Sequence, residues 1–344
     1  MPQLRKDHII GRWVIIAEER GKRPYDFITE DDKTRQGFCP LCPGNEFSTP
    51  PEIAVTKGDI GSEYDWHVRV VPNKYPALII EGDLDKRGEG IYDKMNGIGA
   101  HEVIIDTPEH HATFAKMSVG QLSMIFRAYR DRILDLEQDP RFKYIIIFKN
   151  YGKSAGASLE HSHSQLIALP VIPHRIEEEL NGCKRYFDYK ERCVFCDIIR
   201  QEQHQRIRIV TENSKFITIC PFASRTPFEM WVLPKEHRSR YIYMDNEALD
   251  MLADIFAKTM KMLDALLPSV SYNFMLHTAP LRYSSMEHYH WHFEIVPKVT
   301  TLAGFEWGTG FYINPLPPEE ATRQLRHPEK ALNTTEHAEA ENKI

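Results

Sequence analysis

The chain has 344 residues, of which 42% are hydrophobic and 27% are charged, and its 43 Lys and Arg against 49 Asp and Glu give a net charge of −6. This composition excludes a disordered or fibrous chain, and the length favours two domains of ordinary size. No apolar run reaches the roughly 18 residues of a membrane-spanning helix, the N-terminus lacks the apolar stretch of a signal peptide, and no basic run is suited to nucleic acid, so we expect a cytoplasmic protein that binds neither membrane nor nucleic acid.

Predicted strands and helices follow one another in an order that occurs twice. Glu102–Ile105 is predicted as a strand that ends before Pro108, because proline cannot donate to a ladder. Leu122–Leu136 has apolar residues at three-to-four spacing and is predicted as an amphipathic helix, and Tyr144–Phe148 is predicted as a strand from its β-branched and aromatic residues. The same strand, helix and strand are predicted again at Met230–Leu233, Ala248–Leu263 and Tyr272–Leu276.

Cysteine and histidine motifs repeat together with these elements. Each copy has a C-x-x-C pair, then an isolated histidine, then an H-x-H; 51 residues separate His110 from His161, and 53 separate His237 from His290. Because order and spacing agree, we interpret the two halves as copies of one module. The predicted fold class is α+β, with two tandem halves that each contain a mainly antiparallel sheet and a flanking helix.

The predicted boundary lies in a polar segment. Residues 171–192 are polar and predicted to be helical rather than part of a sheet. We therefore predict an N-terminal half at 1–182 and a C-terminal half at 183–327. The last segment, 328–344, is polar and lacks an apolar face, so it is expected to be disordered.

The paired cysteines predict two structural zinc sites. In a reducing compartment, C-x-x-C pairs indicate metal binding or redox chemistry rather than a disulfide framework, and two histidines can complete a zinc tetrahedron. A thioredoxin-like redox pair and ordinary buried cysteines stay open as alternatives, while Cys183 and Cys220 are expected to be core or surface thiols. The predicted ligands are Cys39, Cys42, His110 and His161 in the first half and Cys193, Cys196, His237 and His290 in the second.

The H-x-H-x-Q run of the first half is a candidate catalytic site. On a strand, His161, His163 and Gln165 would project to one side. A neutral imidazole can attack phosphorus, and an amide can bond phosphoryl oxygens without the repulsion of a carboxylate. The second half has Glu294 where the first has Gln165, so we expect catalysis only in the first half and a structural role for His292. Metal binding by both histidines of the run is the alternative.

These motifs carry a resemblance to a known family. His161-Ser-His163-Ser-Gln165, preceded by Asn150 and Gly156-Ala-Ser158, resembles the active-site segment of the galactose-1-phosphate uridylyltransferase family, within the histidine-triad superfamily. The resemblance implies two histidine-triad-like halves and a homodimer. Other matching motifs extend over nearly the whole chain: Gly11-Arg-Trp-Val-Ile, Arg20-Gly-Lys-Arg23-Pro24, Cys39-Pro-Leu-Cys42-Pro-Gly-Asn, Val71-Pro-Asn73-Lys-Tyr-Pro76 and Pro108-Glu-His110.

The resemblance implies a ping-pong transfer between a nucleotide sugar and a sugar phosphate. His163 would attack the α-phosphorus of UDP-glucose and release glucose 1-phosphate, and the uridylyl-histidine would pass UMP to galactose 1-phosphate to give UDP-galactose. Gln165 would hold the phosphoryl oxygens of the intermediate. The residues implied to bind substrate are Asn73, Asn150, Gly156 and Ser158 near the nucleotide and its phosphates, and Arg20 and Arg23 near the sugar phosphate.

Two other functions stay open. An H-S-H-S-Q run with two Cys₂His₂ zinc sites is also similar to ADP-glucose phosphorylase of the same superfamily, in which phosphate accepts an adenylyl group. The third hypothesis is a non-enzymatic, zinc-stapled nucleotide-binding module. His163 argues against it, because this histidine is not among the predicted metal ligands.

The sequence departs from well-known bacterial members of the family. Their H-P-H is H-S-H here, with Ser162 expected at an outward-facing position, and Gly310-Phe-Tyr-Ile-Asn-Pro315 lacks their hexose-binding glutamate and glutamine. Some members hold iron in the second half, although the Cys193/Cys196 pair favours zinc there. The matches to the iron ligands are Glu179, His277, His290 and His292.

Overall fold

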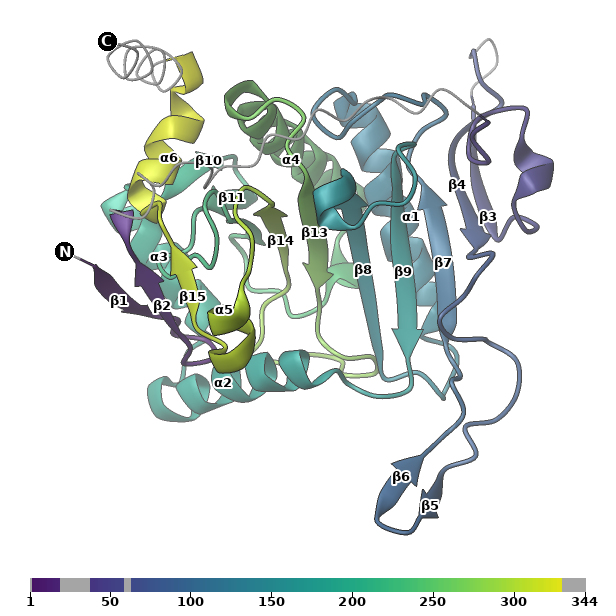
Figure 1. The fold of residues 1–344 in the computed structure, drawn as a ribbon, viewed down its shortest axis with the longest axis horizontal. Coiled ribbons are helices and arrows are strands. Elements are labelled where there is room, and N and C mark those ends of the chain that lie inside the picture. The colour runs from purple at the N-terminus through teal and green to yellow at the C-terminus, as the bar shows by residue number, and fades with distance from the viewer. Residues whose placement is uncertain (1, 19–37, 59–62, 330–344) are drawn as a thin grey trace.

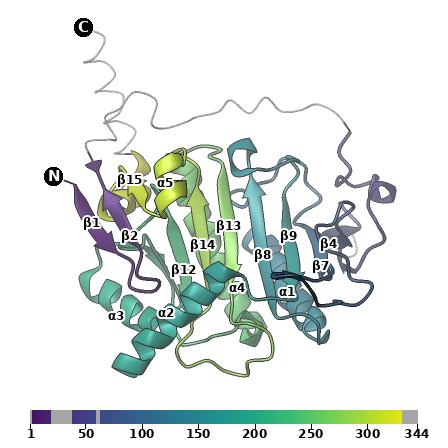
Figure 2. The ribbon, with the colours of Figure 1, turned by 60° about the horizontal axis from the view of Figure 1, so that its bottom comes forward.

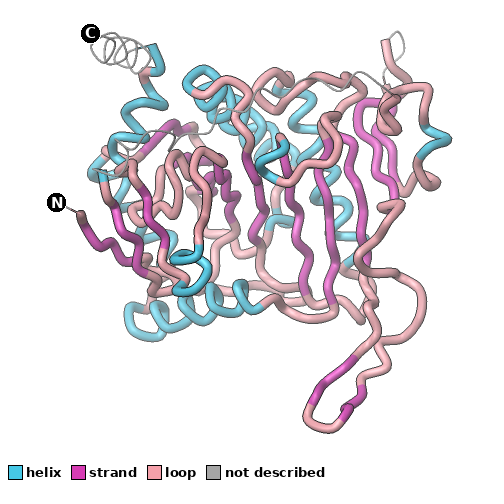
Figure 3. The backbone as a smooth tube through the Cα atoms, viewed as in Figure 1, coloured by secondary structure: helices cyan, strands magenta, loops and turns pink. Residues whose placement is uncertain are grey.

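The computed structural model describes residues 2–18, 38–58 and 63–329. Arg20 and Arg23, for which a substrate-binding role is predicted, and nearly all of the 328–344 segment lie outside these ranges. A ten-stranded sheet runs through the described chain, and every neighbouring pair of its strands is antiparallel (Figure 1; strands magenta in Figure 3). Its strands, in sheet order, are β10 (Ile209–Glu212), β11 (Phe216–Ile219), β12 (Met230–Pro234), β14 (His292–Pro297), β13 (Tyr272–His277), β8 (Tyr144–Tyr151), β9 (His163–Leu169), β7 (Ala100–Ile105), β4 (Trp66–Pro72) and β3 (Ala54–Lys57).

The order of the strands preserves the sequence repeat. Five strands of the first half, β3-β4-β7-β9-β8, mirror five of the second, β10-β11-β12-β14-β13. The two sets join where β8 pairs with β13, with Ile147 opposite Leu276 and Tyr151 opposite Tyr272. The predicted α+β fold with two repeated halves is confirmed, and the two antiparallel sheets are fused into one.

One helix per half covers the same face of this sheet. These are α1 (Val119–Leu136) and α4 (Asn246–Leu266), which pack against each other behind the strands (Figure 1). Each begins at a residue whose side chain accepts from a backbone N–H of the first turn: Ser118 from Gln121, and Asp245 from Ala248. Both helices contain the predicted amphipathic stretches, so their apolar faces form the main core with the sheet.

The opposite face differs between the halves. In β12, Met230 and Val232 join the core under α1 and α4, while Trp231 and Leu233 join a second apolar cluster with residues of α2 (His174–Lys190) and α3 (Val194–Gln205). The second half is therefore buried on both faces, with α2 and α3 on the side away from α4 (Figure 2). In β9, alternate residues from Gln165 to Leu169 are only half-buried, so that face of the first half is accessible.

The remaining elements flank the large sheet. The predicted boundary at 182/183 falls inside α2, which connects the halves, so the division into two domains stays a prediction. None of the described helices is long and apolar enough to cross a bilayer. The other elements are β1 (Gln3–Lys6), β2 (Trp13–Ile16) and β15 (Tyr312–Asn314) in a small sheet, the β5 (Arg87–Glu89) and β6 (Tyr92–Lys94) hairpin, α5 (Gly304–Thr309), α6 (Pro318–Arg326), and the 3₁₀ turns η2 (Glu46–Ser48), η3 (Lys153–Ala155) and η4 (Tyr241–Tyr243).

Candidate active site and metal centres

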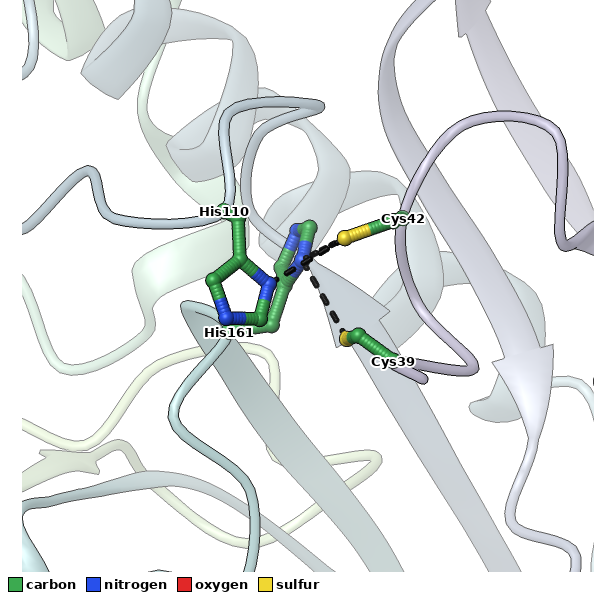
Figure 4. Close-up of side chains that lie close together, drawn as sticks. All are labelled: Cys39, Cys42, His110 and His161. Carbon is green, nitrogen blue, oxygen red and sulfur yellow. Dashed lines mark hydrogen bonds between the residues drawn. The ribbon is translucent and has the colours of Figure 1, made fainter. Parts of the chain in front are cut away.

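Four predicted ligands of the first half converge from separate segments (Figure 4). Cys39 and Cys42 lie on one tight turn, where the Cys42 N–H donates to the Cys39 carbonyl, while His110 follows β7 and His161 precedes β9. His161 Nδ1 is 3.7 Å from Cys39 Sγ and 3.4 Å from Cys42 Sγ, and His110 Nδ1 is 3.1 Å from Cys42 Sγ. This group is a Cys₂His₂ candidate metal centre.

The donors of this centre fit zinc. Zinc bonds to sulfur and nitrogen imply a sulfur-to-nitrogen edge of about 3.6 Å in a tetrahedron, close to the observed separations. His161 Nε2 lies 2.7 Å from the Thr107 carbonyl oxygen, which only accepts, so Nε2 carries the proton and the Nδ1 lone pair faces the thiols. Burial lowers the pKa of His161 to about 4, which keeps the ring neutral, as metal ligation requires.

The second half repeats this arrangement with Cys193, Cys196, His237 and His290. Cys196 Sγ is 3.4 Å from His237 Nδ1 and 3.6 Å from His290 Nδ1. The outer nitrogen, Nε2, again faces a carbonyl in each ring: that of Pro234 at 2.9 Å from His290, and that of Met286 at 3.3 Å from His237. The shared geometry makes this a second Cys₂His₂ candidate centre.

The set of four residues matched to iron ligands is divided between two places. Glu179, His277 and His292 lie together, with His277 Nδ1 3.0 Å from Glu179 Oε2, but His290 belongs to the cysteine centre. The four-residue interpretation is therefore wrong for His290. This grouping is the one that the Cys193/Cys196 pair favours, with His290 in the cysteine group.

The strand that carries the candidate nucleophile begins two residues later than predicted. It begins at His163, so His161 lies before β9 and its ring reaches the metal centre. His163 Nδ1 is 2.8 Å from the His161 carbonyl oxygen, so Nδ1 carries the proton and the lone pair resides on Nε2. Burial lowers the pKa of His163, and the nearby Lys149 ammonium lowers it further, so the ring is neutral near neutral pH.

Gln165 lies two residues beyond His163 on β9 and is half-buried. Its Oε1 is 2.9 Å from His101 Nε2, and Asn73 Nδ2 is 3.1 Å from the same nitrogen. Asn73, which follows β4, is thereby placed next to Gln165 through a histidine of β7. The sequence analysis missed His101, because its proximity to Gln165 depends on the pairing of β7 with β9.

The other residues implied to bind substrate lie at the end of β8 and in the loop after it. Asn150 is half-buried, and its Oδ1 accepts from Asn273 Nδ2 at 2.9 Å. Gly156 adopts a left-handed φ of 88°, and a Cβ there would lie 3.9 Å from Asn150 Nδ2. Ser158 is exposed. The loop therefore passes close to Asn150 while leaving its own polar groups accessible.

A buried polar network supports β9 from the helix side. Lys149 Nζ donates to Asp106 Oδ2 at 2.7 Å, to Ser162 Oγ at 2.8 Å and to the His163 carbonyl at 2.9 Å, and Ser164 Oγ donates to Asp106 Oδ1 at 2.9 Å. The expectation of an outward-facing Ser162 is wrong, because only 2% of it is exposed. The hydroxyls of both serines of H-S-H-S-Q hydrogen-bond to the buried Lys149–Asp106 ion pair, which a proline side chain could not do. Cys183 and Cys220 are core thiols.

Known proteins and protein families match this chain over nearly its whole length. The sequence matches the family described as galactose-1-phosphate uridyl transferase, N-terminal domain, over residues 1–173, and a domain of unknown function over residues 98–342. ADP-glucose phosphorylase of Arabidopsis thaliana is 35% identical over 332 residues, which cover 94% of this chain and 92% of that protein. Galactose-1-phosphate uridylyltransferase of Thermotoga maritima is 31% identical over 341 residues, which cover 96% of this chain and 99% of that protein. The crystal structure of the Arabidopsis phosphorylase with bound ADP-glucose matches with a TM-score of 0.81 at 34% identity, over 95% of this chain and 99% of that one.

Proposed function

The chain belongs to the galactose-1-phosphate uridylyltransferase family, and from this premise we propose that it transfers a nucleotidyl group from a nucleotide sugar through a covalent bond to His163. The observation that carries the proposal is the hydrogen bond from His163 Nδ1 to the His161 carbonyl, which leaves Nε2 unprotonated. A neutral ring with a fixed tautomer is what attack on phosphorus requires.

The proposed first half-reaction forms one bond and breaks one. The His163 Nε2 lone pair attacks the α-phosphorus, the α-phosphorus to bridging-oxygen bond breaks, and the sugar 1-phosphate leaves with that oxygen and its electron pair. In the second half-reaction a phosphate oxygen of the acceptor attacks the same phosphorus and the nitrogen to phosphorus bond breaks. The Gln165 amide would donate to the phosphoryl oxygens at both stages, without adding negative charge.

The first candidate reaction is transfer of UMP from UDP-glucose to galactose 1-phosphate. The family match and the Thermotoga maritima uridylyltransferase support it. The nucleotide and its phosphates would be bound by Asn73, Asn150, Gly156 and Ser158, and the sugar phosphate by Arg20 and Arg23. The protein would act as a homodimer.

The second candidate reaction is adenylyl transfer from ADP-glucose to phosphate. A specific observation favours it, since the Arabidopsis thaliana ADP-glucose phosphorylase matches at 35% identity over 94% of this chain. Both reactions use the same nucleophile and differ in the base and the acceptor.

The two Cys₂His₂ groups would hold zinc in a structural role. Bound zinc would crosslink the segments that carry the ligands, and in the first half it would fix His161. Because the His161 carbonyl accepts from His163, a fixed His161 would hold the nucleophile ring in its orientation.

The test is the intact mass of the protein after brief incubation with UDP-glucose or with ADP-glucose, without acceptor. A uridylyl adduct that disappears on addition of galactose 1-phosphate supports the first reaction. An adenylyl adduct that disappears on addition of phosphate supports the second. If neither donor leaves an adduct while the protein still binds a nucleotide sugar, the covalent proposal is wrong and the non-enzymatic binding module becomes the better interpretation.

A further inference from the structure

His101 lies between two amide side chains of the candidate active site. The Ala77 backbone N–H donates to His101 Nδ1 at 3.0 Å. On the other side of the ring, Nε2 is 2.9 Å from Gln165 Oε1 and 3.1 Å from Asn73 Nδ2. His101 is on β7 (Ala100–Ile105), whose Val103 pairs with Gln165 of β9.

The Ala77 contact determines which nitrogen of His101 carries the proton. A backbone N–H only donates, so Nδ1 must accept and be unprotonated. The neutral ring then carries its proton on Nε2, and that proton needs an acceptor. Gln165 Oε1 is an acceptor within hydrogen-bond distance, whereas the Asn73 amide nitrogen is a donor. The chemistry therefore selects the bond from His101 to Gln165.

This bond fixes the direction of the Gln165 amide. With Oε1 accepting from His101, the NH₂ group is turned away from the histidine, and no hydrogen bond within the described ranges uses it. Rotation of the amide by half a turn would leave the Nε2 proton facing the amide nitrogens of both Gln165 and Asn73, without the acceptor that Gln165 Oε1 provides. Asn73 is oriented in the same sense, because its Oδ1 accepts from the Tyr75 N–H at 2.9 Å, which leaves its amide hydrogens available.

We propose that His101 is a positioning residue that holds the Gln165 amide with its NH₂ group toward the phosphoryl oxygens of the nucleotidyl donor. The inference rests on the proposed function, since it assigns the donor that the covalent step uses. An amide turned the other way would present its carbonyl oxygen to an anion, and repulsion would replace a hydrogen bond.

The test measures adduct formation in a single turnover at saturating donor, for whichever nucleotide sugar labels the wild type. His101→Phe keeps a ring but removes both nitrogens, and His101→Gln keeps an N–H group near the place of Nε2. We expect His101→Phe to slow adduct formation by about 10-fold to 100-fold, the range for loss of a hydrogen bond to a charged group. His101→Gln should retain most of the rate, and the matched surface variant His174→Phe should match wild type, because His174 is 85% exposed on α2.

A double-mutant cycle separates positioning from a structural role. If His101 acts through Gln165, then His101→Phe changes the rate by no more than about twofold once Gln165→Ala is present. Losses that multiply in the double variant would overturn the inference, as would a wild-type rate in His101→Phe. Should that variant fold poorly, a His101→Gln protein with a wild-type melting temperature and a rate as low as that of Gln165→Ala would also overturn it. A wild type that forms no adduct would instead overturn the proposed function, together with the inference that rests on it.

Discussion

Strands β9 and β14 each begin at the second histidine of an H-x-H motif. The two histidines of each motif make matching contacts, but the residues around the two strands differ. In each copy the first histidine reaches a Cys₂His₂ centre and the second keeps Nδ1 near the carbonyl of the first, at 2.8 Å for His163 and 3.2 Å for His292. The difference lies at the next position on the same side of the strand. Gln165 is half-buried and bonds a neutral histidine, whereas Glu294 is buried and its Oε2 accepts from Arg225 at 2.7 Å.

Access to the second histidine also differs. The Phe195 ring centroid lies 4.8 Å from that of His292, and the Trp231 ring centroid lies 5.6 Å from it, so α3 and β12 cover the second copy. On the helix side, Trp291 and Phe293 occupy the places of Ser162 and Ser164. The second copy thus pairs or buries its groups. In the first copy Gln165 is half-buried, and no hydrogen bond among the described residues uses its NH₂ group, which lies on the same strand as the proposed nucleophile His163.

The sharpest test of this comparison removes the second histidine of each motif. His163→Ala should lower turnover by about 10⁴-fold or more and abolish the covalent adduct, because the proposed nucleophile itself is lost. His292→Ala should keep turnover within a few-fold of wild type and lower the melting temperature. Turnover and intact mass measure both effects.

Metal content distinguishes the two outcomes for the histidine variants. His163→Ala should bind as much zinc as wild type and melt at the same temperature, because His163 is not a ligand in either centre. Retained turnover in His163→Ala, or an adduct lost in His292→Ala, would remove the asymmetry between the copies.

Loss of one thiolate should lower zinc content and stability in either centre, but it should slow turnover only in the first. Cys39→Ser and Cys193→Ser should each release about one zinc per chain and destabilise the fold by several kcal/mol, since structural zinc contributes folding free energy. Cys39→Ser should also slow turnover, because His161 is a predicted ligand of that centre and its carbonyl accepts from His163. Metal analysis and kinetics check this, with Cys220→Ser as a control at a buried thiol outside both centres. An unchanged zinc content in Cys193→Ser would refute the second site.

Placing the carboxylate of the second copy in the first tests the role of charge. Gln165→Glu should lower turnover by more than the about 10²-fold to 10³-fold that removal of one oriented donor costs, because a carboxylate also repels the phosphoryl oxygens. Gln165→Ala should lose less than Gln165→Glu, since it removes the donor without adding a negative charge. Equal losses in the two variants would show that the charge at this position does not matter.

The elements and the candidate metal ligands could be predicted from the sequence, because periodicity indicates the elements and the repeated motif order groups the ligands. Apolar periodicity determined the helices at Leu122–Leu136 and Ala248–Leu263, and both lie inside the observed α1 and α4. The repeated order of cysteines and histidines grouped the eight candidate metal ligands, and the structure brings each set of four together.

The contacts that define the candidate site could not be predicted, because they depend on strand pairing and burial. His101 meets Gln165 only through the register of β7 with β9. Lys149 and Asp106 resemble surface charges in sequence, yet they form a buried ion pair at 2.7 Å. The domain boundary at 182/183 and the substrate-binding roles of Arg20 and Arg23 remain predictions.

The smallest expected change in turnover tests whether the second copy is only structural. Glu294→Gln gives that copy the glutamine of the first, but Phe195 and Trp231 still cover His292, so turnover should stay within about twofold of wild type with no adduct on His292. The protein should lose about 3 kcal/mol of stability at neutral pH, because Arg225 loses one of its two buried carboxylate partners.

The pH dependence of that loss identifies its origin. Burial raises the pKa of Glu294, but the charges of Arg225, His277, His292 and Arg175 together outweigh burial, so the net pKa lies below its ordinary value. A carboxylate with a depressed folded-state pKa stabilises the fold above its unfolded pKa of about 4.3, and this contribution disappears as the pH falls through the folded-state value. The difference in unfolding free energy between wild type and Glu294→Gln should therefore be constant near neutral pH and shrink below about pH 4. A difference in unfolding free energy that stays constant below about pH 4 would assign the loss to packing. A nucleotide adduct on His292 in Glu294→Gln would mean that the charge of Glu294 alone keeps the second copy from reacting.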